Sequence, residues 1–176
     1  RNIINYFENN LSISVSLILS NKQTAPVLDI GKQFDINTLV INRVDFYNST
    51  ELLDVFETEK IDFVVLAGFL WLIPSYLVNA FNNRIINIHP ALLPKYGGKG
   101  MYGMNVHKAV YAAKEKETGI TIHYVNEAYD EGNIIFQANC SLDAEDTPEN
   151  IAQKIHQLEH ANFPRVIEAT IDKING

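Results

Sequence analysis

The sequence predicts an α/β protein with a Rossmann-like, mostly parallel sheet and flanking helices, in which the first strand of the fold is absent. Helical and strand-like segments alternate along the first half of the chain with short connections, an order typical of parallel sheets covered by helices. Residues 62–68 (DFVVLAG) form a continuous apolar run of the kind found in strands buried on both faces. The chain begins with a helical pattern, whereas a βαβ fold normally begins with a strand. We therefore expect one strand and its turn to be missing before Arg1.

The first half of the chain contains four pairs of a helix followed by a strand. The opening residues place Ile3, Ile4 and Phe7 at helical spacing. Ser49 supplies the start of the third helix, and Pro74 fits the first position of the fourth. We expect helices over residues 1–10, 25–34, 49–60 and 74–81, followed in turn by strands over 12–20, 38–41, 62–68 and 84–89.

The pattern changes after residue 96. Residues 96–105 (YGGKGMYGMN) form a Gly-rich loop that lacks the spacing of a Walker A or GxGxxG phosphate loop. Thr147 and Pro148 suit the N-cap and the first position of the final helix. We expect a helix over about 105–116, strands over 118–125 and 132–142, and a helix over 146–171, all within one domain of residues 1–176.

The composition is that of an ordinary globular protein, with 47% hydrophobic and 20% charged residues. A formal net charge of −7 and a pI near 5.2 argue against a nucleic acid or an anionic membrane as partner, because either requires clustered Lys and Arg. No apolar stretch approaches the roughly 18 residues of a membrane span, and no signal-peptide pattern is present. Cys140 is the one cysteine, so the chain forms no disulfide within itself and no multi-cysteine zinc site. We expect a cytoplasmic protein.

Polar side chains stand at the carboxyl end of the strand expected over 84–89. Asn87 and His89 are two residues apart, which places both side chains on one face of a strand, at the end where open α/β sheets bind ligands. Pro90 ends this strand because it cannot donate to a ladder. Asp130 lies in the turn between the last two strands, and a carboxylate beside a His fixes its orientation. An amide, an imidazole and a carboxylate suit acyl transfer to an amine, which needs no activated Ser or Cys.

Structural roles are the alternative for these and the other candidate residues. A His after an apolar strand often satisfies a buried contact, and an Asp close to a Gly is a common turn residue. His107 can face a ligand or solvent. His123 lies between Ile122 and Tyr124 on a strand, and this position favours a structural role. His156 and His160 are four apart on the last helix, but without an HExxH pattern or a supporting cysteine we expect no metal. Residues 71–74 (WLIP) suit either the core or the wall of a pocket for a flat aromatic ligand.

Five ordered segments resemble one known family, and the resemblance covers nearly the whole chain, from Ser12 to about Ile167. The resemblance is to the phosphoribosylglycinamide formyltransferases of de novo purine synthesis, and it implies the formyltransferase fold. It also implies transfer of a formyl group from 10-formyltetrahydrofolate to the amine of glycinamide ribonucleotide, with small molecules as the only partners and no metal. The segments are AGF (67–69), NIHPALLPKY (87–96), GITIHYV (119–125), DEGNIIFQ (130–137) and LEHANFP (158–164).

The resemblance implies a role for individual residues. Asn87, His89 and Asp130 are the implied catalytic residues. His89 acts as general acid or proton shuttle, Asn87 helps to hold the tetrahedral oxyanion, and Asp130 orients His89 and raises its pKa. Gly68 and Glu159 are the implied contacts of the ribonucleotide substrate, with Glu159 at the amine end. The implied folate-binding residues are Leu70, Trp71, Leu72, Ile73, Asn87, Val125 and Asp130.

The chain departs from the family pattern at three places. The opening strand and Gly-Ser-rich phosphate loop are absent before Arg1. Trp71 stands where many members carry Arg, which alters the wall of the folate pocket. The loop over residues 96–107 is longer than in several relatives, which suggests a lid that orders on binding.

Other activities share the same Asn-x-His core. Methionyl-tRNA formyltransferase carries an extra C-terminal domain and a basic surface, whereas this chain is acidic. Formyltetrahydrofolate hydrolase and sugar-nucleotide formyltransferases are further alternatives. A non-catalytic folate-binding module is an alternative from a different class. The sequence leaves the oligomeric state open.

Overall fold

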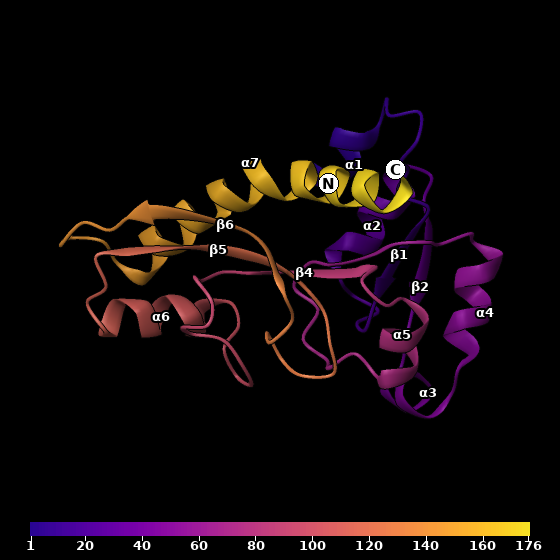
Figure 1. The fold of residues 1–176 in the computed structure, drawn as a ribbon, viewed down its shortest axis with the longest axis horizontal. Helices are drawn as coiled ribbons and strands as arrows, with labels where there is room; N and C mark the ends of the chain where they lie inside the picture. Colours follow the sequence, from indigo (N-terminus) through magenta and orange to yellow (C-terminus); the bar gives the residue numbers. More distant parts are fainter.

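Six strands form two sheets in the computed structural model, which describes residues 1–176 (Figure 1). The strands are β1 (Leu17–Ser20), β2 (Asn37–Val40), β3 (Val64–Leu66), β4 (Ile85–His89), β5 (Glu117–Tyr124) and β6 (Ile134–Ser141). β1 and β2 pair in parallel, and the other four lie in the order β3-β4-β5-β6. β3 and β4 are parallel, whereas β5 runs antiparallel to both of its neighbours. The predicted α/β class with parallel strands and flanking helices is confirmed, and the last two strands add antiparallel ladders.

Seven helices flank the strands, and the last of them runs along much of the length of the molecule (Figure 1). They are α1 (Asn2–Phe7), α2 (Pro26–Gln33), α3 (Arg43–Asn48), α4 (Glu51–Thr58), α5 (Ser75–Ala80), α6 (Met104–Ala112) and α7 (Pro148–Asn175). α3, α4 and α5 supply Phe46, Leu52 and Leu77 to an apolar cluster with Ile85 of β4. α6 and α7 pack together against β5. No helix is both long enough and apolar enough to cross a membrane.

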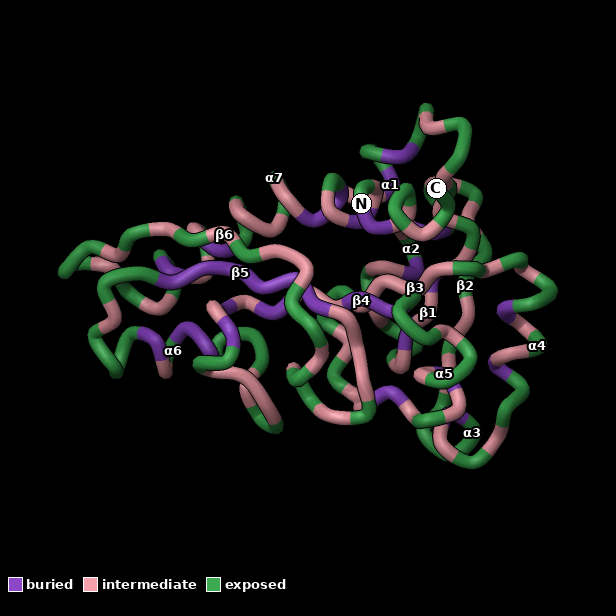
Figure 2. The backbone as a smooth tube through the Cα atoms, viewed as in Figure 1, coloured by how far each residue is buried: buried purple, intermediate pink, exposed green.

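β4 is buried on both faces, as expected of the strand that carries the candidate site. Ile85 packs into the cluster of α3, α4 and α5, while Ile86, which is fully buried, packs with Ile122 and Phe163. Figure 2 shows the buried stretch running through β4 and β5. The apolar residues of β4 therefore hold the strand rigidly between two apolar clusters. Asn87 and His89, the polar residues at its end, are fixed with it.

The expected elements are all present, with several differences in detail. The strand expected over 62–68 is shorter, Val64–Leu66, and the first helix ends at Phe7 rather than at residue 10. α3 was not predicted, because it has only six residues and buries only Phe46. It begins where the Asn42 side chain accepts a hydrogen bond from the Asp45 amide at 3.0 Å. The strand expected over 12–20 begins at Leu17, because the Asn10 side chain accepts from the amides of Ser12 and Ile13 and forms a local turn instead. The helix expected over about 105–116 ends at Ala112.

α7 continues through Pro164, which is buried inside the helix. A proline has no backbone N–H, so the carbonyl of His160, four residues earlier, loses its usual helical donor. The side-chain amide of Asn2 donates to this carbonyl at 2.9 Å. Tyr6 and Asn10 also bond Glu168 of α7. These contacts dock α1 on α7 and bring the start of the chain beside the last helix.

Candidate active site

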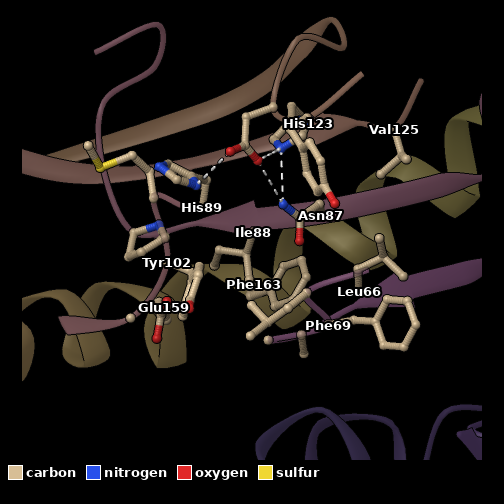
Figure 3. Close-up of a pocket in the computed structure, with 18 of the residues that line it drawn as sticks. Leu66, Phe69, Asn87, Ile88, His89, Tyr102, His123, Val125, Glu159 and Phe163 are labelled. Carbon is tan, nitrogen blue, oxygen red and sulfur yellow. Dashed lines mark hydrogen bonds and ion pairs between the residues drawn. The ribbon is translucent and has the colours of Figure 1, made fainter. Parts of the chain in front are cut away.

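A cavity of about 790 Å³ opens at the carboxyl ends of β3 and β4 and extends to α7 (Figure 3). All of the residues singled out as catalytic, folate-binding or substrate-binding line this one cavity. They are Gly68, Leu70, Trp71, Leu72, Ile73, Asn87, His89, Val125, Asp130 and Glu159. The structure thus brings together residues that are up to 91 positions apart in the chain, from Gly68 to Glu159 (159 − 68). Their individual roles stay predictions.

β4 positions the first two polar residues. Asn87 and His89 stand opposite His123 and Thr121 of β5 in the antiparallel register. His89 is 3% exposed, and Asn87 is half-buried at the cavity wall. Because β4 is packed on both faces, neither residue can turn away without disturbing the core.

The turn after β5 places Asp130 beside His89, and two glycines, Gly132 and Gly98, allow this position. Asp130 itself has a φ of 57°, in the left-handed region that costs energy for a residue with a side chain. A Cβ atom on Gly132 would lie 1.6 Å from the carbonyl oxygen of Tyr124, so only glycine fits there. The amide of Gly98, in the Gly-rich loop, donates to Asp130 Oδ2 at 2.9 Å. The D-x-G segment and the loop therefore hold the carboxylate between them.

The ring of His89 faces an oxygen at each nitrogen. Its Nε2 atom lies 2.7 Å from the carbonyl oxygen of Tyr96, and its Nδ1 atom lies 3.4 Å from Asp130 Oδ2. A carbonyl only accepts hydrogen bonds, so Nε2 carries the proton of the neutral ring and Nδ1 turns its lone pair toward the carboxylate. A proton arriving at Nδ1 would be held between the two groups.

The pKa of His89 is lowered, which corrects the expectation that it is raised. Burial lowers this pKa, because it penalises the charged ring, while Asp130 and the Tyr96 carbonyl raise it by a smaller amount. The neutral, proton-accepting form of His89 therefore dominates at neutral pH.

The pKa of Asp130 is also lowered. Burial alone would raise it, but the hydrogen bonds and charges of His123, His89 and the Gly98 amide together favour the carboxylate. A buried anion thus lies beside a neutral imidazole, ready to stabilise the imidazolium when it forms.

His123 belongs to the same polar group, although the sequence favoured a structural role for it. Its Nε2 atom lies 3.1 Å from Asn87 Nδ2 and 3.6 Å from Asp130 Oδ1 (Figure 3). Asn87 Nδ2 also lies 3.5 Å from Asp130 Oδ1. The signal that finds His123 is its register opposite Asn87, which appears only once β4 and β5 are paired.

Aromatic residues form the wall at the predicted folate side. Trp71 packs at 5.5 Å from Phe46 and 5.8 Å from Phe69, measured between ring centroids. Arg43 lies over the ring of Trp71 at 5.8 Å, a cation–π contact. Ile73 is only 6% exposed and packs mainly into the core, so it offers the cavity less surface than its neighbours. Residues 71–74 therefore serve both the core and the cavity wall.

The far wall comes from α7 and the Gly-rich loop. Glu159 Oε2 lies 2.9 Å from His156 Nδ1, and both residues line the cavity. Lys99 and Tyr102 bring the loop over residues 96–107 to the cavity edge. His107, 3% exposed, also lines the cavity and has a buried Nδ1 atom without a hydrogen-bond partner.

Comparisons with known proteins show the family to which the chain belongs. The family model described as formyl transferase matches residues 2–167. The chain is 42% identical to the chloroplastic phosphoribosylglycinamide formyltransferase of Arabidopsis thaliana over 90% of its own length and 56% of that protein. It is 34% identical to the phosphoribosylglycinamide formyltransferase of Bacillus subtilis over 92% of its own length and 82% of that protein. The chain thus spans about half of the plant relative and most of the bacterial one.

Two solved structures resemble the chain in three dimensions. The phosphoribosylglycinamide formyltransferase of Bacillus halodurans superposes with a TM-score of 0.86 at 34% identity, covering 98% of this chain and 89% of that one. The enzyme of Anaplasma phagocytophilum gives the same TM-score of 0.86 at 33% identity, covering 98% of this chain and 80% of that one. The chain therefore belongs to the formyl transferase family, and within it to the phosphoribosylglycinamide formyltransferase family that its sequence resembles.

Proposed function

We propose that the protein transfers the formyl group of 10-formyltetrahydrofolate to the amine of glycinamide ribonucleotide, a step of purine biosynthesis. The observation that carries the proposal is the meeting of Asn87, His89 and Asp130 at one wall of a cavity of about 790 Å³, in a chain of this family. This volume lies in the range of small-molecule sites, about 300–1,000 Å³. The names of the relatives supply the substrate, and the site supplies groups suited to the chemistry.

The reaction requires a proton to move from one nitrogen to another. The amine attacks the formyl carbon, a new C–N bond forms, and the formyl oxygen becomes negative. The amine nitrogen must then lose a proton, and the folate nitrogen must gain one as its bond to the formyl carbon breaks. In our proposal, neutral His89 receives the first proton at Nδ1, where Asp130 holds it at the observed separation of 3.4 Å.

The proton on His89 then serves two purposes. The imidazolium lies close to the negative formyl oxygen and stabilises it, because charges attract strongly in a site that excludes water. It subsequently gives up the proton to the leaving nitrogen. Burial keeps the pKa of His89 low, so the ring is free of this proton at the start of each cycle.

The two substrates occupy different walls of the cavity in this proposal. The folate lies along Leu70, Trp71 and Leu72, where the aromatic cluster offers a flat apolar surface, and reaches the backbone near Val125. The ribonucleotide lies toward Glu159, whose carboxylate suits the amine end. Gly68 follows β3 with a φ of 73°, and no atom lies within 4 Å of the position of a Cβ, so substrate can approach its backbone closely.

The test is a formyl-transfer assay on the full-length protein with 10-formyltetrahydrofolate. The proposal expects formylated ribonucleotide to form when glycinamide ribonucleotide is present, and no turnover without an acceptor. Formate release without acceptor would support a hydrolase instead. Binding without turnover would support a folate-binding module. The Asp130→Asn variant is the matched control, because it keeps the side-chain shape while removing the charge.

A further inference from the structure

The backbone of Tyr96 makes the shorter of the two polar contacts of the His89 ring. Its carbonyl oxygen lies 2.7 Å from His89 Nε2, whereas Asp130 Oδ2 lies 3.4 Å from the other ring nitrogen, Nδ1. The φ of Tyr96 is 57°, in the left-handed region that is unfavourable for a residue with a side chain. A backbone persists in this conformation only when other contacts hold it there.

The side chain of Tyr96 supplies such contacts. Its hydroxyl donates to Glu115 Oε1 at 2.8 Å, and Lys95 Nζ lies 2.9 Å from the same oxygen. Hydrogen bonds from Lys95 and Tyr96 hold the pKa of Glu115 below its ordinary value, so the acceptor is a carboxylate at neutral pH. The Tyr96 ring packs against the apolar cluster that contains Val106 and Val110 of α6. Tyr96 is therefore anchored to α6 and to the residue that follows this helix closely.

The anchoring residues stand behind the site rather than in it. His89 and Asp130 line the cavity, but Lys95, Tyr96 and Glu115 do not. A substrate in the cavity therefore touches none of the three. Any effect of this anchor on the reaction has to pass through His89.

The Tyr96 carbonyl determines which nitrogen of His89 exchanges a proton. A carbonyl oxygen only accepts hydrogen bonds, so Nε2 keeps its hydrogen in both the neutral and the charged ring. Nδ1 is then the nitrogen that gains and loses a proton, beside the carboxylate of Asp130. A neutral ring with its hydrogen on Nδ1 would set the lone pair of Nε2 against the carbonyl oxygen at 2.7 Å, which is unfavourable.

We propose that Tyr96 is a positioning residue whose side chain, anchored on Glu115, keeps its own backbone carbonyl at Nε2 of His89 and so reserves Nδ1 for proton transfer. The inference rests on the proposed function and deepens it, because it states how the proton of that reaction is confined to one nitrogen. A ring with its hydrogen on the wrong nitrogen would have to change tautomer before each turnover, which lowers kcat.

The state of His89 can be measured in the full-length protein without substrate. In nitrogen-15 NMR spectra we expect Nε2 to have the chemical shift of a protonated nitrogen at every pH at which the protein is folded. Nδ1 should change from the unprotonated to the protonated shift as His89 takes up a proton. In the Tyr96→Phe variant the two tautomers of the neutral ring should mix, which moves both shifts. An unprotonated Nε2 in the wild type, or identical shifts in the variant, would overturn the proposal.

Substitutions of the anchor separate positioning from substrate contact. Tyr96→Phe removes only the hydroxyl, and we expect it to lower kcat by about 10-fold, the scale of one lost hydrogen bond to a charged group. Both KM values should stay unchanged, because Tyr96 does not line the cavity. Tyr111→Phe, which removes the hydroxyl of an exposed tyrosine on α6, is the matched control and should keep the wild-type kcat. A Tyr96→Phe variant with the kcat of this control would reject the inference.

Variants of Glu115 test whether the hydroxyl acts through its acceptor. Glu115→Leu removes the acceptor and should lower kcat as Tyr96→Phe does, whereas Glu115→Gln keeps an oxygen there and should recover most of the loss. Melting temperatures show whether all of these variants fold. Equal kcat values for Glu115→Leu and Glu115→Gln would contradict the proposal.

A double-mutant cycle completes the test. In the Tyr96→Phe background the Glu115→Leu change should have almost no further effect on kcat. Independent, multiplying effects would show that Glu115 acts by another route and would reject the inference. If the wild-type protein transfers no formyl group at all, the proposed function fails, while the NMR spectra still decide whether Tyr96 fixes the tautomer of His89.

Discussion

The Nδ1 atom of His89 lies 3.4 Å from the Oδ2 atom of Asp130, and this contact joins strand β4 to the turn after β5. The strand is fixed by the core around Ile85 and Ile86, and the turn is fixed by the Gly98 amide. A proton on His89 therefore finds its counter-charge in place before substrate arrives. This preorganisation lets the carboxylate stabilise the imidazolium without any rearrangement of the site.

Replacing His89 by Ala should lower kcat by about 100-fold or more, the scale of general acid–base catalysis. The reason is that no other group offers an unprotonated nitrogen beside Asp130 Oδ2. Steady-state formyl transfer measures the effect. Ile122→Val is the control, because it removes a fully buried methyl group from the facing strand and leaves the polar residues intact. A His89→Ala variant as active as this control would remove His89 from the mechanism.

Replacing Asp130 by Asn should lower kcat strongly and move the pH profile in a defined direction. The pKa of His89 is lowered by burial and raised in part by the charge of Asp130. Without that charge the pKa falls further, so the decline of kcat/KM on the acid side, where His89 becomes protonated, shifts to lower pH. The measurement is kcat/KM from pH 5 to 9 for both proteins. An unchanged acid limb would separate Asp130 from His89.

Replacing Trp71 by Ala should weaken folate binding more than catalysis. Trp71 supplies the aromatic wall beside Phe69. We expect the KM for 10-formyltetrahydrofolate to rise about 10-fold while kcat changes little, as for a contact made equally in the ground and transition states. The KM for the ribonucleotide serves as the internal control. A selective rise in that KM instead would place the folate on a different wall.

Replacing Gly132 by Ala should destabilise the protein by about 2–3 kcal/mol, at the upper end of overpacking effects. A Cβ atom there would meet the Tyr124 carbonyl at 1.6 Å, and this backbone atom cannot move aside cheaply. Gly100→Ala is the matched control, because its φ of 91° imposes strain while no atom lies within 4 Å. Urea denaturation compares the two, and a loss at Gly132 no larger than the loss at Gly100 would show that the clash costs no more than backbone strain alone.

Replacing His107 by Leu should stabilise the protein most at acid pH. Burial lowers the pKa of His107 below 6.5, so the unfolded chain takes up a proton that the folded protein resists, and stability falls as the pH drops below that value. Leu removes this loss and also removes the unpartnered Nδ1 atom, which costs roughly 1 kcal/mol. Melting temperatures at pH 8 and pH 5.5 measure both effects. A variant that loses stability with acid as steeply as the wild type would contradict the account.

The sequence predicted much of the site because its residues obey strand geometry. The two-residue spacing of Asn87 and His89 gave their common face directly, and β4 confirms it. Asp130 lies 41 positions beyond His89 (130 − 89), so its approach depends on the turn and on loop contacts with Gly98 that spacing does not encode. The sequence named Asp130 as a candidate from its place in the turn between two strands, and the family resemblance implied its catalytic role.

His123 and α3 show what local patterns leave out. His123 alternates with Ile122 on β5 like an ordinary inward-facing residue, and only its register opposite Asn87 reveals the contact. α3 is held by the Asn42 cap and by Phe46, which packs against Phe69 and Trp71 in a later part of the chain. The expectation that the pKa of His89 is raised was also wrong, because burial lowers this pKa by more than the neighbouring carboxylate raises it.

The most direct test of the central claim follows an isotope-labelled formyl carbon from 10-formyltetrahydrofolate in the presence of glycinamide ribonucleotide. The account predicts that the label moves to the amine of the ribonucleotide, one molecule for each tetrahydrofolate released, and that Asp130→Asn nearly abolishes this transfer. Label that stays on the folate, or that leaves as formate whether or not the ribonucleotide is present, would contradict it.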